Sequence, residues 1–346
     1  MILKNGRSIV YGGEPYIVAE LNSSHGGKID VAREMIEAAK SCGCDAVKFQ
    51  SWSAESLYCQ DYYEQNPIAK RMVNGFSLKP DELLELSEYC NSIGIDFSST
   101  PYSNAEADFL VEQCKTPFVK IASMDINNFP FLRYIAAKNV PIVLSTGMAT
   151  IEEIESAVRE IEGTGNHNLC ILHCVSLYPV EAGAVNLNNM VMLKERFPEY
   201  AVGYSDHTIG GEVACAAVGL GAALIEKHFT LNSQKIGWDN QMATEPAEMK
   251  RLIEGCRKVH SALGQYERIL TAEEFEQQKK MRRSMVAAED MPSGHVITEE
   301  DLTAKRPGEG IPVSEYEKLV GRTLNQNIEK DRLILDKHLR EQKQHD

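Results

Sequence analysis

Short apolar runs alternate with longer stretches of helical periodicity from Tyr16 to Leu263. Apolar runs bounded by polar turns are typical of buried strands, and apolar residues three or four positions apart indicate amphipathic helices. The runs that predict strands are Tyr16–Leu21, Ala46–Ser51, Asp96–Pro101, Phe118–Ser123, Ile142–Gly147, Leu169–Ser176, Ala201–His207 and Leu224–Thr230. The clearest predicted helices are Val31–Ser41, Pro80–Ser92, Ala105–Gln113, Ile151–Glu162 and Pro246–Leu263.

Eight strand and helix units in succession predict an α/β fold with a parallel sheet. Runs such as Ile17-Val18-Ala19 are apolar throughout, as in strands that are covered on both faces. We expect closure into a (β/α)8 TIM barrel, because the eighth unit completes the barrel without leftover strands. A doubly wound open sheet is the alternative. The long polar and aromatic segment Ser53–Ser77 is predicted to be a loop at the active-site face.

The pattern changes after Gly264, where a charged helical stretch at Thr271–Arg283 precedes short units at Ser284–Ala288 and Thr298–Leu302. We therefore divide the chain into a barrel (1–265), a linker helix (266–283) and a small C-terminal domain (284–346). A domain of about 60 residues is near the lower size limit for independent folding. We expect it to pack on the barrel or on another subunit.

Composition and charge limit the partners and the compartment. The formal net charge of −14 argues against a nucleic-acid partner, so any anion must be bound locally by a few lysines, arginines and backbone N–H groups. Nine irregularly spaced cysteines indicate reduced thiols in a cytoplasmic protein rather than a disulfide framework. No segment reaches the roughly 18 apolar residues of a membrane span, and no signal-like run begins the chain.

Polar residues gather where each predicted strand ends. In a β/α barrel the carboxyl ends of the strands meet at one face, and the active site lies there. The strand-end residues are Glu20, Lys48, Gln50, Ser98, Ser99, Thr100, Lys120, Ser123, Ser145, Thr146, Ser176, Ser205, Asp206, His207, Glu226, Lys227 and His228. Because all eight strands contribute, we interpret this face as the candidate active site.

Three kinds of sub-site can be distinguished at this face. Lysines supply point charge and small hydroxyl residues let the backbone approach, so together they predict a phosphate or carboxylate site. That anion site comprises Lys48, Lys120, Ser123, Ser145 and Ser205. His207 and His228 end neighbouring strands and suit a divalent transition metal with water in its open positions. A carboxylate set suited to proton transfer or to a hydroxylated substrate comprises Glu20, Asp125, Glu226 and Asp239.

With these residues placed, the chain resembles the sialic acid synthase family from about Pro15 to Leu335. The end of the chain, with Lys305-Arg306-Pro307-Gly308, resembles the family's antifreeze-like (SAF) domain. The matching barrel segments are Ala19-Glu20, Ala46-Val47-Lys48-Phe49-Gln50, Ser99-Thr100-Pro101, Lys120-Ile121-Ala122-Ser123, Leu144-Ser145-Thr146-Gly147-Met148, Leu172-His173-Cys174, Gly203-Tyr204-Ser205-Asp206-His207-Thr208 and Glu226-Lys227-His228-Phe229-Thr230.

The resemblance implies condensation of phosphoenolpyruvate with an N-acyl hexosamine to a nine-carbon 2-keto acid and phosphate. It implies that phosphoenolpyruvate is held by Lys48, Thr100, Lys120, Ser123, Ser145, Ser176 and Ser205. His207 and His228 would bind Mn²⁺, with Mg²⁺ or Co²⁺ as alternatives, and Glu20 or Asp125 would be the general base. The residues implied to face the sugar are Gln50, Tyr178, Asp239 and Arg306. Arg306 would reach the barrel of a second subunit in a domain-swapped homodimer.

Three departures from the family pattern leave the acceptor sugar open. Asp125 stands where relatives commonly have Glu, and Ser176 replaces an Asn seen in some members. Gly237-Trp238-Asp239-Asn240 replaces the more usual Gly-Pro-Asp-His, and we expect Trp238 and Asn240 to flank the sugar. N-acetylmannosamine, a 6-deoxy diacetamido sugar of the legionaminate or pseudaminate type and another hexosamine remain candidates.

Two other functions fit parts of the sequence. An aldolase or lyase acting on 2-keto acids would need a Schiff-base lysine, for which Lys120 is the candidate, although its serine-rich surroundings favour an anion site. A non-enzymatic sugar-binding module could use the C-terminal domain, but that domain does not explain the polar ends of all eight strands.

Overall fold

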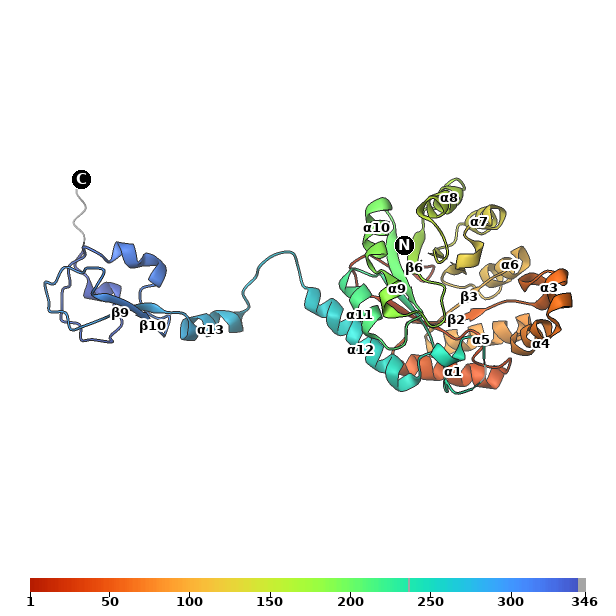
Figure 1. Cartoon of the computed structure of the whole chain (residues 1–346), viewed down its shortest axis with the longest axis horizontal. Helices are drawn as coiled ribbons and strands as arrows, with labels where there is room; N and C mark the ends of the chain where they lie inside the picture. The colour runs from red at the N-terminus through yellow and green to blue at the C-terminus, as the bar shows by residue number, and fades with distance from the viewer. Residues whose placement is uncertain (236, 342–346) are drawn as a thin grey trace. The chain divides into compact units, whose positions relative to one another are not determined.

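The computed structural model describes residues 1–235 and 237–341. The chain forms two compact units, Met1–Gly264 and Gln265–Asp346, and Figure 1 labels the elements of both. No helix in the described part of the chain has the length and apolar composition needed to cross a bilayer.

The first unit contains all eight predicted strands, each ending one or more residues earlier than the sequence pattern suggests. They are β1 (Tyr16–Glu20), β2 (Ala46–Gln50), β3 (Asp96–Thr100), β4 (Val119–Ile121), β5 (Ile142–Ser145), β6 (Leu169–Cys174), β7 (Ala201–Asp206) and β8 (Leu224–His228). The strands are hydrogen-bonded in the order β3-β2-β1-β8-β7-β6-β5-β4, and their described pairings are parallel. The predicted barrel is confirmed.

Side chains link β3 and β4, the two strands at the ends of this order. The hydroxyl of Ser98 donates to the carbonyl of Phe118 at 3.1 Å, and the hydroxyl of Thr116 donates to the carbonyl of Phe97 at 2.9 Å. Both hydroxyls are buried, so these bonds satisfy polar groups that would otherwise be costly at the seam of the barrel.

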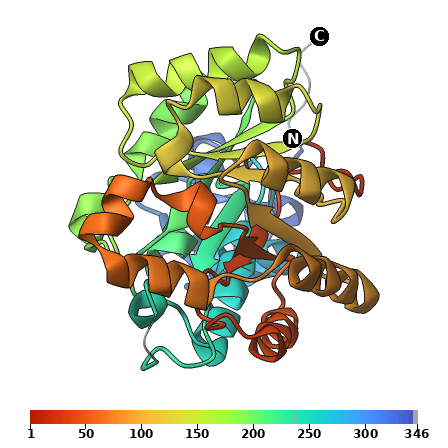
Figure 2. The ribbon, with the colours of Figure 1, turned by 90° about the vertical axis from the view of Figure 1, so that its right-hand side faces the viewer.

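Helices surround the strands (Figure 2). The helices of the barrel are α1 (Ile29–Cys42), α5 (Pro80–Ile93), α6 (Asn104–Glu112), α7 (Phe129–Ala136), α8 (Ile151–Glu162), α9 (Ala182–Val185), α10 (Asn188–Arg196), α11 (Glu212–Gly219) and α12 (Pro246–Leu263). Thr150 caps α8 by accepting from the backbone N–H of Glu153, and Gly43 ends α1 with φ of 94°, a conformation that favours glycine.

The segment predicted as a loop between β2 and α5 is helical, so that prediction is wrong. It forms α2 (Ala54–Leu57), α3 (Gln60–Gln65) and α4 (Pro67–Phe76). Ser53 caps α2 and Pro67 begins α4, a position where proline loses no helical hydrogen bond. Tyr63 and Val73 pack with Trp52 in a small apolar cluster of their own, which stabilises these short helices.

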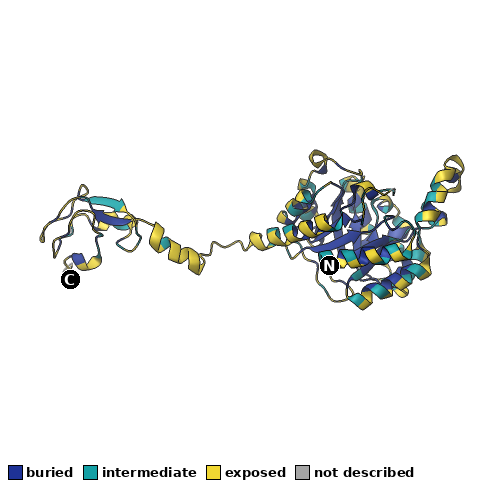
Figure 3. Cartoon of the chain, turned by 90° about the horizontal axis from the view of Figure 1, so that it is seen from below, coloured by how far each residue is buried: buried dark blue, intermediate teal, exposed yellow. Residues whose placement is uncertain are grey.

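Two apolar layers follow from the alternation of side chains along the strands. Residues such as Ile17 and Ala19 face the helices and belong to the main core. Tyr16 and Val18 face the barrel interior and pack with Leu3 and Ile9 near the start of the chain. Figure 3 shows the strands as buried, with exposed residues on the outer helices. At the carboxyl ends of the strands, the inward positions become polar.

The second unit consists of α13 (Ala272–Met281) and a small domain with its own core. Its two strands, β9 (Ser284–Ala287) and β10 (Leu302–Lys305), pair antiparallel. The unit expected at Thr298–Leu302 is mostly a turn, in which the Asp301 carboxylate accepts from the backbone N–H of Thr298 at 2.7 Å. The 3-10 turns η3 (Val313–Lys318) and η4 (Asp336–His338) complete it.

Candidate active site

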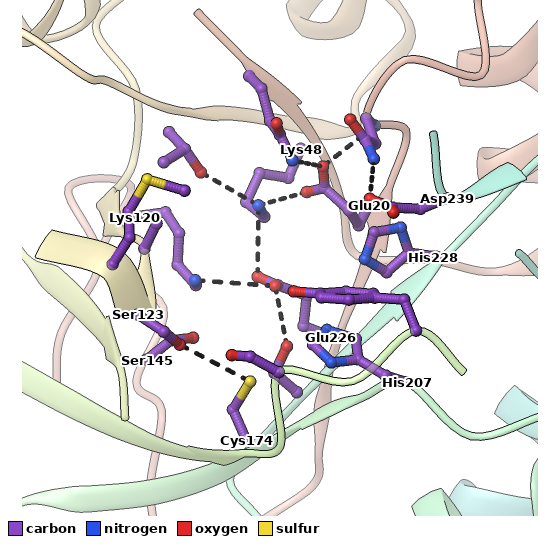
Figure 4. Close-up of a pocket in the computed structure, with 18 of the residues that line it drawn as sticks. Glu20, Lys48, Lys120, Ser123, Ser145, Cys174, His207, Glu226, His228 and Asp239 are labelled. Carbon is purple, nitrogen blue, oxygen red and sulfur yellow. Dashed lines mark hydrogen bonds and ion pairs between the residues drawn. The ribbon is translucent and has the colours of Figure 1, made fainter. Parts of the chain in front are cut away.

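A cavity of about 410 Å³ lies at the carboxyl ends of the barrel strands. Of the fifteen residues to which the family resemblance gives a role in catalysis or in binding of phosphoenolpyruvate, metal or sugar, thirteen line it. They are Glu20, Lys48, Gln50, Thr100, Lys120, Ser123, Ser145, Ser176, Tyr178, Ser205, His207, His228 and Asp239. Figure 4 shows Lys120, Ser123 and Ser145 on one side of this cavity and His228 and Asp239 on the other.

Strand alternation explains why these side chains converge. Tyr16, Val18 and Glu20 of β1 point inward, and so do Ala46 and Lys48 of β2. Each inward row is apolar at the base of the barrel and polar at its last position. The sequence therefore places a charged or hydroxyl residue on the cavity from almost every strand.

The floor of the cavity is a cluster of two lysines and two carboxylates. Lys48 forms an ion pair with Glu20 and donates to the hydroxyl of Thr100 at 3.1 Å. The carboxylate of Glu226 lies 3.8 Å from the ammonium nitrogens of both Lys48 and Lys120. All four charged side chains are buried. Glu226 therefore occupies the centre of the site, between the two cations.

Burial and charge move the pKa values of this cluster in different directions. Burial raises the pKa of Glu20 to about 7, although the neighbouring Lys48 acts against this. Burial acts on Glu226 in the same way, but Lys120 and Lys48 outweigh it and lower its pKa. Burial lowers the pKa of Lys120. Two carboxyls with separated pKa values are suited to proton transfer by one and charge stabilisation by the other.

Small residues next to Lys120 leave room for an anion. The hydroxyl of Ser123 accepts from the backbone N–H of Gly147 at 3.0 Å, and the hydroxyl of Ser145 is buried with no hydrogen-bond partner among the described residues. A Cβ at Gly147 would lie 2.2 Å from the hydroxyl of Ser176 and 2.9 Å from that of Ser123. The site thus offers an unused hydroxyl beside a lysine, in a pocket that only glycine leaves open.

His207 and His228 face each other at the end of β7 and β8, with ring centroids 5.3 Å apart. Nδ1 of His207 lies 2.7 Å from the carbonyl oxygen of Val175. Because a carbonyl only accepts, this bond places the proton on Nδ1 and leaves Nε2 with a free lone pair. Burial lowers the pKa of both imidazoles, which favours their neutral form. The neutral form is the one that can bind a metal ion.

A metal ion bound by these two imidazoles would need water or substrate as its other ligands. Within residues 1–235 and 237–341, no group of three or more His, Cys, Asp and Glu side chains is placed to bind an ion. Two neutral nitrogen ligands with open positions fit a catalytic rather than a structural metal centre.

An ion pair beneath the histidines connects the same two strands. Asp206 and Lys227 are fully buried, lie opposite each other in β7 and β8, and contact at 2.8 Å. Asp206 also accepts from the backbone N–H of Thr208 at 2.9 Å. Each member of the pair adjoins one of the histidines in sequence, so this contact restrains the backbone on which both imidazoles stand.

The remaining side of the cavity carries amide, carboxylate and aromatic groups. Gln50 donates to Glu20 at 3.1 Å and accepts from the hydroxyl of Tyr102 at 3.1 Å. Asn22 donates to Asp239. Trp238 lines the cavity as expected.

Asn240, by contrast, does not line the cavity, so the expectation that it flanks the sugar is wrong. It is buried, and its amide donates to the carbonyls of Asn232 at 2.8 Å and Lys235 at 2.7 Å. Its role is to stabilise the loop that carries Trp238.

Two of the proposed residues lie elsewhere. Asp125 is in the 3-10 turn η1 (Ser123–Asp125), accepts from Asn128 at 3.0 Å, and does not line the cavity. Arg306 is an exposed residue of the second unit, immediately after β10, and its part in the site stays a prediction.

Sequence reasoning overlooked Cys174, Trp52 and Tyr102, which all line the cavity. Cys174 could have been found, because it continues the inward row of Cys170 and Leu172 on β6. The two aromatic residues follow strand ends in segments without periodicity, so no pattern marked them.

A β/α barrel whose cavity has a floor of lysines and carboxylates beside two histidines has the layout of an enzyme active site. Comparison with known families then identifies it. The NeuB family model matches residues 35–268 and the SAF domain model matches residues 282–340. The chain belongs to the NeuB family and carries a C-terminal SAF domain.

Two named synthases are similar to this chain over more than nine tenths of its length. N,N'-diacetyllegionaminic acid synthase of Legionella pneumophila is 35% identical over 337 residues, which cover 94% of each chain. N-acetylneuraminate-9-phosphate synthase of Homo sapiens is 34% identical over 93% of this chain and 91% of that protein. A crystal structure of N-acetylneuraminic acid synthetase from Leptospira borgpetersenii is 32% identical, with a TM-score of 0.71 over 77% of this chain and 90% of that one. The protein is therefore an enzyme of the nonulosonic acid synthase family.

Proposed function

We propose that this enzyme is a metal-dependent transferase that condenses phosphoenolpyruvate with an N-acyl hexosamine to give a nine-carbon 2-keto acid and phosphate. The observation that carries the proposal is a single cavity with two buried lysines, an unused serine hydroxyl and two neutral histidines. The names of the relatives above support the same class of product.

The lysine side of the cavity would bind phosphoenolpyruvate. Lys48 and Lys120 neutralise its carboxylate and phosphate, and hydroxyl groups complete its coordination. The hydroxyl donors would be Thr100, Ser123, Ser145, Ser176 and Ser205. In the free enzyme the Glu226 carboxylate lies between the two lysines and accepts a hydrogen bond from the hydroxyl of Ser205 at 3.1 Å. The incoming anion must therefore compete with this carboxylate for the lysines.

His207 and His228 would hold the divalent ion, for which Mn²⁺ is our first choice. A divalent ion bound there would act as a Lewis acid on the carbonyl of the open-chain sugar. The sugar lies between this pair and Asp239, with Gln50 and Tyr178 at its side. Carbon 3 of phosphoenolpyruvate forms the new bond to that carbonyl carbon, water adds at carbon 2, and phosphate leaves by cleavage of its bond to carbon 2.

Glu20 is the better of the two candidate general bases. Its pKa of about 7 lets it take a proton near neutral pH, and its carboxylate lines the cavity beside Lys48. Asp125 lies outside the lining and is bonded to Asn128. We therefore assign to Glu20 the proton that the attacking water loses.

The test is phosphate release from phosphoenolpyruvate, measured with and without sugar and with and without Mn²⁺. We expect release only when both are present. His207→Ala should abolish it, whereas His167→Ala, an exposed histidine beside Tyr200, should not. Absence of release across a panel of N-acyl hexosamines with Mn²⁺ or Mg²⁺ would refute the proposal.

A 2-keto-acid aldolase or lyase is a second candidate, because burial lowers the pKa of Lys120 and a lysine with a low pKa can form a Schiff base. The Glu226 carboxylate and the hydroxyls around Lys120 favour anion binding instead. Trapping with pyruvate and borohydride distinguishes the two: a covalent adduct at Lys120 would favour the aldolase.

We also propose that the enzyme works as a domain-swapped homodimer in which Arg306 serves the partner's cavity. Exposed apolar side chains follow β4 to β7 at the carboxyl face, and such a patch is typical of a surface that another covers. They are Met124, Met148, Leu177 and Ile209. Mixing Arg306→Ala with His207→Ala chains should restore about a quarter of wild-type activity, because half of the randomly mixed dimers carry one intact site. No recovery would refute the swap.

A further inference from the structure

The carboxylate that we assign as general base is held by three groups of the chain. Oε1 of Glu20 accepts from the backbone N–H of Asn22 at 3.0 Å and from the side-chain amide of Gln50 at 3.1 Å. Oε2 forms the ion pair with Lys48. A backbone N–H and an ammonium group can only donate. Gln50 differs from them, because a side-chain amide presents either its NH2 group or its oxygen, depending on how it is turned.

The orientation of the Gln50 amide decides whether it supports the charged form of Glu20. In the structure the NH2 group faces Oε1 and donates to it. With the amide reversed, its oxygen would face a carboxylate oxygen, and two acceptors at this distance repel each other. A general base must be unprotonated before it takes a proton, so the observed orientation is the one that Glu20 needs.

The hydroxyl of Tyr102 sets this orientation. It donates to Oε1 of Gln50 at 3.1 Å, at the other end of the amide group from Glu20. Burial holds the pKa of the Tyr102 phenol well above its ordinary value, so the hydroxyl keeps its proton and can donate. Within residues 1–235 and 237–341, the Gln50 side chain has these two hydrogen bonds and no others. Without the hydroxyl, the amide would be free to turn.

Tyr102 is itself fixed by its backbone and by its ring. Its backbone N–H donates to the carboxylate of Glu106 on α6 at 2.6 Å. The same carboxylate accepts from the hydroxyl of Ser56 on α2 at 2.6 Å. The ring of Tyr102 lies beside that of Trp52, with centroids 6.0 Å apart. A side chain that orients another must be restrained in this way, because its own freedom would pass to the group that it holds.

We infer that Tyr102 is a positioning residue for the general base: its hydroxyl fixes the Gln50 amide so that an N–H group faces Glu20. The inference rests on the proposed function, which assigns the proton of the attacking water to Glu20. Gln50 keeps its second N–H for the sugar, because a side-chain amide has two and Glu20 uses one. In this role Tyr102 needs no contact with either substrate.

Removing the hydroxyl alone tests this role. Tyr102→Phe keeps the ring beside Trp52, so the packing is retained. We expect kcat to fall about tenfold and the KM for phosphoenolpyruvate to stay within about twofold of the wild type, because the base is affected and the anion site is not. Tyr134→Phe is the matched control. It removes a hydroxyl that donates to Asp108 at 2.8 Å on α7, outside the cavity, and should change neither constant.

A double-mutant cycle shows whether Tyr102 acts through Gln50. In a Gln50→Met background the amide is absent, so Tyr102→Phe should lower kcat by less than about twofold more. The same loss in both backgrounds would overturn the inference, because Tyr102 would then act on a substrate or on the fold. An unchanged kcat in Tyr102→Phe alone would contradict it as well.

A spectroscopic measurement follows the amide without turnover. In protein labelled with ¹⁵N at glutamine side chains, the signals of Gln50 are those that Gln50→Met lacks. Its two amide protons should differ widely in chemical shift in the wild type, because one of them is bonded to a carboxylate. Tyr102→Phe should narrow this difference as the amide turns, and Tyr134→Phe should not. An unchanged difference in Tyr102→Phe would show that the hydroxyl does not hold the amide.

The two proposals fail differently. Phosphate release by the wild type, with kcat unchanged in Tyr102→Phe, would leave the proposed function intact and remove the positioning role. No phosphate release by the wild type with any N-acyl hexosamine would refute the proposed function. The amide signals would still decide in that case whether Tyr102 fixes Gln50 against Glu20.

Discussion

Replacing Glu20 by glutamine tests the most unusual electrostatic feature of the cavity. In the folded chain, burial raises the pKa of Glu20 from an ordinary 4.5 to about 7. The folded state therefore holds this proton more tightly than the unfolded state does. A difference of this size corresponds to about 3 kcal/mol, and Glu20 is fully buried, so solvent does not screen it.

The direction of the pH effect follows from the raised pKa. Below pH 4.5 the carboxyl is protonated in both states and imposes no penalty. As the pH rises to 7, the unfolded chain loses the proton first, so the wild type becomes less stable relative to the variant. We expect Glu20→Gln to gain about 3 kcal/mol of unfolding free energy over the wild type between pH 4.5 and 8, beyond any constant offset from the lost contact with Lys48.

Urea unfolding followed by tryptophan fluorescence measures this difference in the barrel alone, because both tryptophans lie there. Glu195→Gln, at an exposed position of α10, is the control and should track the wild type at every pH. If Glu20 is also the general base, kcat/KM of the wild type should rise as the pH passes through 7. Glu20→Gln should abolish this pH dependence and lower the rate by about 10² to 10⁴. A stability difference that is constant from pH 4.5 to 8 would refute the reasoning.

Three further predictions concern the packing of the site. Lys227→Met should destabilise the barrel by about 3 kcal/mol in urea unfolding, because it leaves Asp206 buried without its cation. Adding Asp206→Asn to this variant should recover part of the loss. Equal stability of the wild type, the single variant and the double variant would contradict this. Gly147→Ala should raise the KM for phosphoenolpyruvate at least about tenfold, because the new methyl group meets Ser123 and Ser176, and an unchanged KM would show that the anion lies elsewhere. His207→Ala should weaken Mn²⁺ binding by at least about tenfold in calorimetry, and unchanged affinity would remove this ligand from the metal site.

Much of the architecture follows from local pattern. The eight strands and the inward polar positions such as Glu20 and Lys48 could be predicted, because a buried parallel strand is marked by its own apolar run and side chains alternate along it. The helices α2 to α4 could not, because each is short and is stabilised by contacts of Tyr63 and Val73 with Trp52 rather than by its own periodicity.

The sequence by itself determined which chemical groups reach the carboxyl face of the barrel: two lysines, two histidines and a set of serines at fixed strand ends. Only the tertiary structure decided which of these groups contact one another and which line the cavity. It placed Glu226 between the lysines, left Asp125 outside the cavity and brought Trp238 against Trp52 across almost two hundred residues of chain. Burial and charge depend on distances between strands far apart in sequence, so the raised pKa of Glu20 and the contact between Trp52 and Trp238 exist only in the folded protein.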